Sequence, residues 1–135
     1  MRRYVIASHH RLAKGLKDTL EFLTARRDIR DINAYVDDQE LDEQIQSVFS
    51  SFSPEDEVII MTDMLGGSVN QHFCPYMSEK RHLICGISLP CALSLVLIPD
   101  NLPLTREGLH QIVEDSKNHL IYVNEYEAAN DPKDE

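Results

Sequence analysis

The stretch VIASHHRLAKGL, Val5 to Leu16, changes from one side-chain pattern to another within a few residues. Its first half is short, apolar and partly β-branched, which is typical of a strand. Its second half begins a run of leucines at helical spacing, which predicts a helix. Two adjacent histidines, His9 and His10, stand at the junction. A strand that passes directly into a helix is the first half of a βαβ unit.

The same alternation repeats along the chain. Strand character returns at Asp31–Val36, Glu57–Asp63 and His82–Ser88, and helical patterns follow each segment. Asp37 or Asp38 is expected to cap the second helix. Later helices are expected over about 90–98 and 104–119, and a last short strand at LIYVN, Leu120–Asn124. Strands alternating with helices predict an α/β fold whose parallel sheet has right-handed crossovers.

Composition sets limits on the classes of protein that fit. A chain of 135 residues is typical of one domain, and its net charge of −10 disfavours nucleic acid as a partner. No apolar run approaches the roughly 20 residues of a membrane span, and the N-terminus lacks the pattern of a signal peptide. The three cysteines form no CxxC pair, so reduced thiols and a cytoplasmic location are expected. Residues 1–124 are expected to form the domain and 125–135 an acidic flexible tail.

Polar clusters follow the first three predicted strands. In a parallel sheet the functional crevice lies beyond the carboxyl ends of the strands, where such clusters gather. The first and third clusters would be neighbours if the third strand lies beside the first. The clusters are Ser8-His9-His10, Asp37-Asp38, and Thr62-Asp63 with Gly66-Gly67-Ser68.

His9 and Asp63 are the candidate catalytic residues. A neutral imidazole nitrogen is a good nucleophile and can carry a phosphoryl group. If Asp63 accepts a hydrogen bond from Nδ1 of His9, it leaves Nε2 unprotonated and facing outward. Structural roles fit both residues as well, because His9 stands at a helix start and Asp63 could cap a helix or a turn. His10 is expected to have a structural role at the edge of the site.

The segment Gly66, Gly67 and Ser68 reads as a plain turn or as a phosphate cradle. Two glycines let backbone N–H groups approach an anion, and Ser68 adds a hydroxyl donor. No GxxxxGK[ST] motif occurs, so a kinase that uses nucleoside triphosphates is disfavoured. The chain also lacks HExxH and any ligand-spaced Cys/His cluster, so neither a metal nor a cofactor is expected.

Three segments together resemble the IIA component of the mannose/fructose/sorbose family of the bacterial phosphoenolpyruvate-dependent sugar phosphotransferase system (PTS). ASHHRLAKGL, from Ala7, is similar to the family's Ser-His-Gly pattern, and MTDMLGGSVNQ, from Met61, to its Thr-Asp-x-x-Gly-Gly-Ser segment. CGISLP, from Cys85, is similar to its Gly-x-Asn-x-Pro strand end. The resemblance covers roughly Arg3 to Asn124. His10 replaces the usual glycine and Ser88 the frequent asparagine, and we expect the first change to reduce tolerance at the site without abolishing function.

The resemblance implies a phosphotransferase that works as a phosphoryl carrier. His9 would be phosphorylated, Asp63 would orient it, and Gly66, Gly67 and Ser68 would help to hold the phosphoryl group. The donor would be the phosphohistidine carrier protein HPr and the acceptor a IIB component, whose membrane companions IIC and IID import the sugar. The implied fold is a parallel sheet of order 2-1-3-4 between helices. The strand Leu120–Asn124 would be antiparallel and exchanged within a homodimer.

Other functions fit parts of the pattern. A phosphoryl-transfer subunit of a dihydroxyacetone kinase has a similar N-terminal domain, and a regulatory module would use phosphorylated His9 as a signal. A receiver domain needs acidic residues after its first strand, where this chain has Ser-His-His. A flavodoxin needs a hydroxyl- and glycine-rich phosphate loop at the same place.

Overall fold

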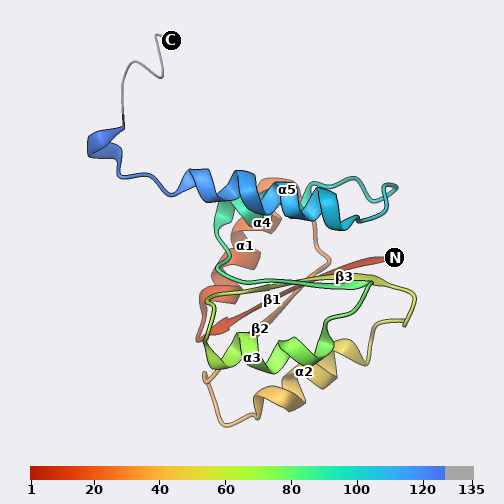
Figure 1. Ribbon diagram of the computed structural model, residues 1–135. Helices are drawn as coiled ribbons and strands as arrows, with labels where there is room; N and C mark the ends of the chain where they lie inside the picture. Colours follow the sequence, from red (N-terminus) through yellow and green to blue (C-terminus); the bar gives the residue numbers. More distant parts are fainter. Residues whose placement is uncertain (127–135) are drawn as a thin grey trace.

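The computed structural model describes residues 1–126 and shows a four-stranded parallel sheet (Figure 1). Its order is β2-β1-β3-β4, and every pairing is parallel. The expected α/β class and strand order are therefore confirmed. The strands are β1 (Arg2–His9), β2 (Ile29–Ala34), β3 (Glu57–Thr62) and β4 (Arg81–Ile84).

Helices cover both faces of the sheet (Figure 1). One core joins the sheet to α1 (Leu12–Thr24), α4 (Leu89–Val96) and α5 (Arg106–Ser116). A second core joins the other face to α2 (Leu41–Phe49) and α3 (Ser68–Phe73). Short 3-10 helices lie at Cys74–Tyr76, Lys117–His119 and Val123–Glu125. The fold is thus three layers, with the sheet in the middle.

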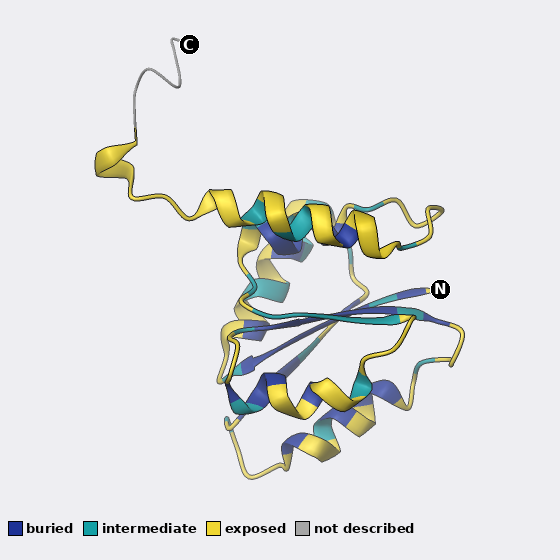
Figure 2. Cartoon of the chain, in the orientation of Figure 1, coloured by how far each residue is buried: buried dark blue, intermediate teal, exposed yellow. Residues whose placement is uncertain are grey.

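Strand β1 shows why the central segments are so apolar. Side chains alternate between the faces of a strand, so Tyr4 and Ile6 enter one core while Val5 and Ala7 enter the other. All four are at most 1% exposed, and Figure 2 shows β1 and β3 as largely buried between helices with exposed outer faces. Because both faces of β1 are covered there, neither set of alternating side chains faces water, which explains the continuous apolar run from Tyr4 to Ala7.

Two strands end earlier than the sequence pattern predicts. β2 ends at Ala34 rather than Val36, because Tyr35 adopts a left-handed backbone with φ of 67°. β4 ends at Ile84, and Gly86, with φ of 74°, turns the chain toward α4. Both endings place a positive-φ residue just past the carboxyl end of a strand, where the chain must leave the sheet.

The predicted cap of the second helix is wrong. Glu40, not Asp37 or Asp38, precedes α2, and its side chain makes no capping hydrogen bond. Asp37 instead accepts a hydrogen bond from the backbone N–H of Gln39 at 2.9 Å, which forms a local turn. Aspartate favours caps and turns for the same reason, since its carboxylate accepts from nearby backbone N–H groups, and here the turn forms.

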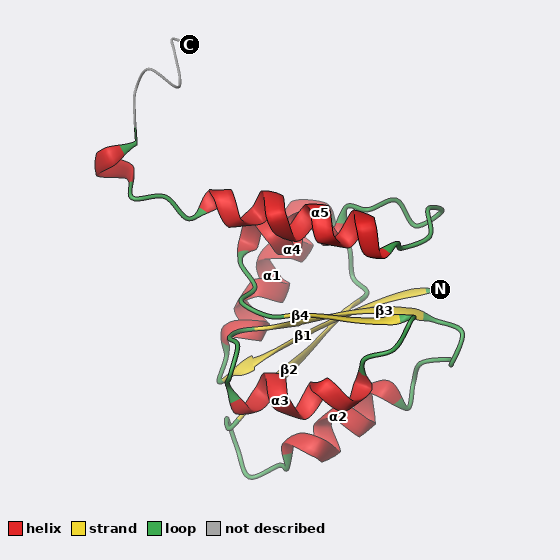
Figure 3. Cartoon of the chain, viewed as in Figure 1, coloured by secondary structure: helices red, strands yellow, loops and turns green. Residues whose placement is uncertain are grey.

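The expected strand over Leu120–Asn124 does not form within the single chain. Val123–Glu125 is a 3-10 helix, and the segment after α5 leads away from the sheet as a loop (Figure 3). A strand needs a neighbouring strand to complete its hydrogen bonds, and none lies beside this segment within residues 1–126. Of the acidic tail expected at 125–135, residues 127–135 lie outside the described part of the chain.

No helix within residues 1–126 combines the length and the apolar character that crossing a bilayer requires.

Candidate functional site

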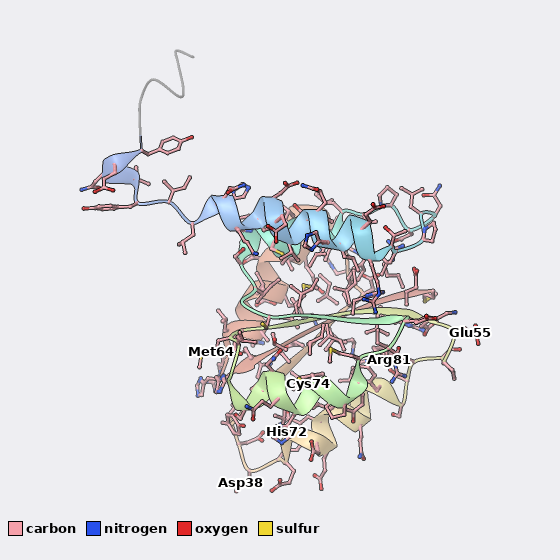
Figure 4. All side chains as sticks on the ribbon, viewed as in Figure 1. Asp38, Glu55, Met64, His72, Cys74 and Arg81 are labelled. Carbon is pink, nitrogen blue, oxygen red and sulfur yellow. The ribbon has the colours of Figure 1, made fainter. Side chains whose placement is uncertain are left out.

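Two loops meet at the carboxyl edge of the sheet because β1 and β3 are parallel neighbours. Ala7 pairs with Thr62, so the residues just beyond, His9 and Asp63, come together. Figure 4 shows Met64, the next residue after Asp63, at one end of the sheet and Glu55, which precedes β3, at the opposite end. The first and third polar clusters of the sequence therefore form one site.

The central contact is between the His9 imidazole and the Asp63 carboxylate. Oδ2 of Asp63 lies 2.8 Å from Nδ1 of His9 and also accepts the backbone N–H of His9 at 2.8 Å. An ionised carboxylate only accepts hydrogen bonds, so Nδ1 carries the hydrogen and the lone pair of the neutral ring lies on Nε2. The Asp63 side chain is 10% exposed and that of His9 is 36% exposed. The carboxylate is thus covered while the imidazole is open to an incoming group.

The surroundings of Asp63 keep it ionised. Partial burial raises the pKa of Asp63, but hydrogen bonds from the backbone and ring of His9 lower it by more, so the pKa lies below its usual value. A negative charge at this place favours positive charge on the ring. The pair is therefore suited to a histidine that becomes cationic when a group is attached at Nε2.

The glycine turn after β3 packs directly on the imidazole. A Cβ atom on Gly67 would lie 3.0 Å from Cε1 of His9 and 3.2 Å from Cγ of Met64, so no larger residue fits without movement. Gly66 has φ of 81°, a conformation that side chains disfavour. The turn brings backbone against the edge of the ring that adjoins Nε2, as a phosphate cradle would require.

Ser68 is joined to a residue that the sequence reading missed. Its Oγ lies 2.6 Å from Oη of Tyr35, and the Tyr35 ring centroid is 5.7 Å from that of His9. Tyr35 follows β2, the neighbour of β1, so it reaches the site from the opposite side to the glycine turn. The polar pair Asp37-Asp38, a little further along the same loop, is not part of the site, since Asp38 lies well away from Met64 (Figure 4).

The turn from β1 into α1 is fixed by Ser8 and strained at His10. Ser8 Oγ accepts the N–H of Ala13 at 2.7 Å and donates to the His10 carbonyl at 3.0 Å. His10 is exposed and has φ of 55°, and its N–H donates to the Ala34 carbonyl at 2.8 Å. A positive φ suits glycine best, which gives a physical reason for glycine at this position of the resembled pattern.

The remaining polar residues near this edge have local partners. His72 Nδ1 lies 2.8 Å from the Ser68 carbonyl, one turn back in α3, and its Nε2 lies 3.8 Å from Asp42. Thr62 donates to Asn70 at 2.7 Å in the buried interior. Within residues 1–126, no three histidine, cysteine or acidic side chains converge in a way that could hold a metal ion.

Comparison with known families identifies the type of protein. The family model described as the PTS system fructose IIA component, of the EIIA-man type, matches residues 3–119. The chain belongs to this family. It is therefore a IIA component, a phosphoryl carrier of sugar phosphotransferase systems, as the three sequence segments predicted.

Solved structures agree with this assignment. A protein from Klebsiella pneumoniae, assigned as a phosphoenolpyruvate-dependent sugar PTS permease, is 31% identical, covers 92% of each chain and has a TM-score of 0.81. The mannose/sorbose-specific IIA subunit from Enterococcus faecalis is 13% identical, with a TM-score of 0.75 over 93% of this chain and 97% of that one. The latter shows the shared fold alone. A comparison with curated sequences gave no significant match.

Proposed function

We propose that this IIA component carries its phosphoryl group on Nε2 of His9. The observation that supports this most strongly is the 2.8 Å contact between Nδ1 and Asp63, which leaves Nε2 as the free nucleophile. Within residues 1–126 no hydrogen-bond partner of Nε2 is found. The side chain is one-third exposed, as docking against another protein requires.

The phosphoryl group would come from phospho-HPr and pass to a IIB component, in a relay that ends in sugar uptake through membrane partners. In the first transfer the bond between phosphorus and the HPr histidine nitrogen breaks as the bond to Nε2 of His9 forms. The hydrogen stays on Nδ1, so the His9 ring becomes cationic and Asp63 offsets the charge. The second transfer reverses these roles toward IIB. The protein contributes mainly the position of the reacting groups and the electrostatics around them, because phosphoryl transfer depends on these two factors.

The glycine turn and Ser68 would hold the phosphoryl oxygens. The Gly67 backbone already lies against the His9 ring, and Gly67 is the residue just before α3. The first backbone N–H groups of a helix have no acceptor within that helix. The Ser68 hydroxyl adds a donor at the same edge. These groups would steady the phosphoryl group without enclosing it, which suits a group that must be handed on.

The test is phosphorylation by phosphoenolpyruvate in the presence of enzyme I and HPr. His9→Ala should take up no phosphate, while His10→Ala, the matched control in the same loop, should still be labelled. Acid-labile phosphate is measured by mass spectrometry of the intact chains, with circular dichroism to confirm folding. Label retained by the folded His9→Ala chain would contradict the proposal.

The same proposal includes a homodimer that exchanges the segment Leu120–Asn124. β4 is an edge strand, no strand of residues 1–126 pairs with its outer side, and a groove of about 780 Å³ runs between β4 and α5. The segment itself is apolar yet exposed: Leu120 is 95% and Tyr122 65% exposed in the single chain. An antiparallel strand from a partner would complete the β4 edge and cover these side chains.

Light scattering after size-exclusion chromatography tests the exchange. The unaltered chain should have the mass of a dimer. Ile121→Pro removes a backbone donor and should shift the mass toward a monomer, while Ile121→Val, which keeps both the donor and strand preference, should not. A monomeric unaltered chain would overturn the exchange and leave the carrier role of His9 untouched.

A further inference from the structure

Tyr35 occupies an unfavourable backbone conformation beside the site. Its φ of 67° lies in the left-handed region, which bulky residues rarely adopt. Three non-glycine residues within residues 1–126 have positive φ, and two of them, His10 and Tyr35, flank His9 at the ends of β1 and β2. Strained backbone that persists at one end of a sheet is a sign of function rather than of packing.

The conformation of Tyr35 gives its side chain two contacts. Its hydroxyl lies 2.6 Å from the Ser68 hydroxyl, and its ring stands 5.7 Å from the His9 ring at an interplanar angle of 43°. A strand that continued through Tyr35 would carry the side chain in a different direction. The ring is also half exposed, at 53%, so burial of apolar surface does not explain its placement.

We propose that Tyr35 is a positioning residue that aims the Ser68 hydroxyl at the phosphoryl group on His9. The inference rests on the proposed function and deepens it. A serine hydroxyl has one hydrogen and two lone pairs. If Tyr35 donates its hydrogen to Ser68 Oγ, the hydrogen of Ser68 is left for an anionic oxygen beside Nε2. The chain of donors then runs from Tyr35 to Ser68 to the phosphoryl oxygen, and each bond strengthens the next.

The proposal separates the hydroxyl of Tyr35 from its ring. Tyr35→Phe keeps the ring beside His9 and removes only the donor to Ser68. Uptake of phosphate from phospho-HPr should slow by about 2- to 10-fold, the effect of one neutral hydrogen bond. The thermal unfolding temperature should change little. Tyr76→Phe is the matched control, because the Tyr76 ring packs on Phe49 and Phe73 in the α2–α3 layer, and its uptake rate should equal that of the unaltered chain.

A double-mutant cycle shows whether Tyr35 acts through Ser68. Ser68→Ala alone and the double variant Tyr35→Phe with Ser68→Ala should have the same uptake rate, because the second change removes nothing once the serine is gone. Additive losses would overturn the positioning role, since they would mean that the Tyr35 hydroxyl acts independently of Ser68.

Changing the hydrogen-bond donor strength of the Tyr35 hydroxyl tests its role further. If that role were purely structural, the rate of phosphate uptake would not follow the donor strength. Site-specific replacement of Tyr35 by 3-fluorotyrosine, a stronger hydrogen-bond donor, should raise the uptake rate above that of the unaltered chain. The assay is run at a pH where the phenol stays protonated. An unchanged or lower rate would show that Tyr35 does not donate to Ser68 in the reaction, and would overturn the proposal.

The outcomes also distinguish this inference from the proposed function. If His9→Ala loses all uptake while Tyr35→Phe keeps the full rate, the carrier role stands and only the role of Tyr35 is overturned. If His9→Ala retains uptake, both are overturned. Three results together support both the carrier role and the role of Tyr35. His9→Ala loses uptake, Tyr35→Phe takes up phosphate more slowly, and Ser68→Ala has the same rate as the double variant Tyr35→Phe with Ser68→Ala.

Discussion

Strands β1 and β3 carry a basic side chain paired with a carboxylate at each end, and the two ends behave differently. At the amino ends, Arg2 pairs with Glu57, and the Arg2 side chain is 2% exposed. At the carboxyl ends, His9 pairs with Asp63, and the His9 side chain is 36% exposed. Figure 4 marks the two ends by Glu55 and Met64. The same neighbouring strands thus make a closed cluster at one edge and an open site at the other.

The difference lies in how many hydrogen-bond partners each basic side chain has. Arg2 donates to Glu57 and to the carbonyls of Ile98, Pro99 and Leu102, so the cluster ties β1 to the loop after α4. Among residues 1–126, His9 has one side-chain partner, Asp63, and no partner is found for its second ring nitrogen. The Arg2 guanidinium spends its donors on hydrogen bonds within the fold, so its role is structural. The His9 imidazole uses one ring nitrogen in this way, and the other can form a covalent bond to an incoming group.

The largest effect is expected at the closed end. Arg2→Ala removes the donor to Oε1 of Glu57 and to three carbonyls of the loop after α4, and should lower the free energy of unfolding by about 2–4 kcal/mol. Urea denaturation measures the loss. Phosphate uptake at low temperature, where the variant stays folded, should be unchanged.

Arg27→Ala is the matched control for that substitution. Arg27 is exposed, and within the described part of the chain its side chain donates only to the nearby carbonyls of Glu21 and Arg26. Its removal should change the unfolding free energy by no more than about 0.5 kcal/mol. An Arg2→Ala chain as stable as Arg27→Ala would remove the distinction between the two ends.

At the open end, Asp63→Asn should slow phosphate uptake while the chain still folds. The substitution replaces a charge-assisted hydrogen bond to Nδ1, worth about 1.5–3 kcal/mol, with a neutral one. If that interaction is lost mainly as the ring becomes cationic, the rate falls by about 10- to 100-fold. Rapid-quench measurement of labelled phosphate gives the rate. A rate within a factor of about two of the original would contradict the role of Asp63.

The pH dependence of stability checks the same carboxylate. The pKa of Asp63 is lowered in the folded chain, so ionised Asp63 contributes stability above its unfolded pKa, and this contribution is lost as pH falls through the folded pKa. The difference in unfolding free energy between the unaltered chain and Asp63→Asn should therefore shrink in acid. If this difference in unfolding free energy stays constant with pH, ionisation of Asp63 does not stabilise the folded chain.

The smallest effect is expected from His10→Gly. A residue other than glycine in the left-handed region costs roughly 1–2 kcal/mol, and the greater freedom of glycine in the unfolded chain offsets part of this gain. The variant should be more stable by about 0–1 kcal/mol in urea denaturation, with uptake retained. His10→Ala, which keeps the positive φ without the imidazole, is the control and should not be stabilised.

Periodicity could predict where the site lies but not all of its members. Strands that alternate with helices must be parallel, so His9 and Asp63 at two strand ends share one edge. The neighbourhood of β1 and β3 and the order 2-1-3-4 came from the family resemblance, because a periodic pattern carries no strand order. His9 and Asp63 could be proposed as a pair because a histidine and a carboxylate follow two strands whose carboxyl ends share that edge.

Tyr35 and the segment Leu120–Asn124 show why the rest could not be predicted. Tyr35 is an aromatic residue near the end of the strand-like segment DINAYV, and aromatic residues favour strands, so nothing in the pattern indicates a positive φ. Leu120–Asn124 has the composition of a strand, but a strand forms only where a neighbour receives its hydrogen bonds. In both cases tertiary surroundings outside the segment decide its conformation.

The position of the phosphoryl group on the ring tests the central claim most directly. The chain is labelled with ¹⁵N at histidine, phosphorylated through HPr, and examined by ³¹P and ¹⁵N NMR. The account predicts one phosphohistidine, at His9, with phosphorus bonded to Nε2 and hydrogen retained on Nδ1. Phosphorus on Nδ1 of His9, or on any other residue, would contradict it.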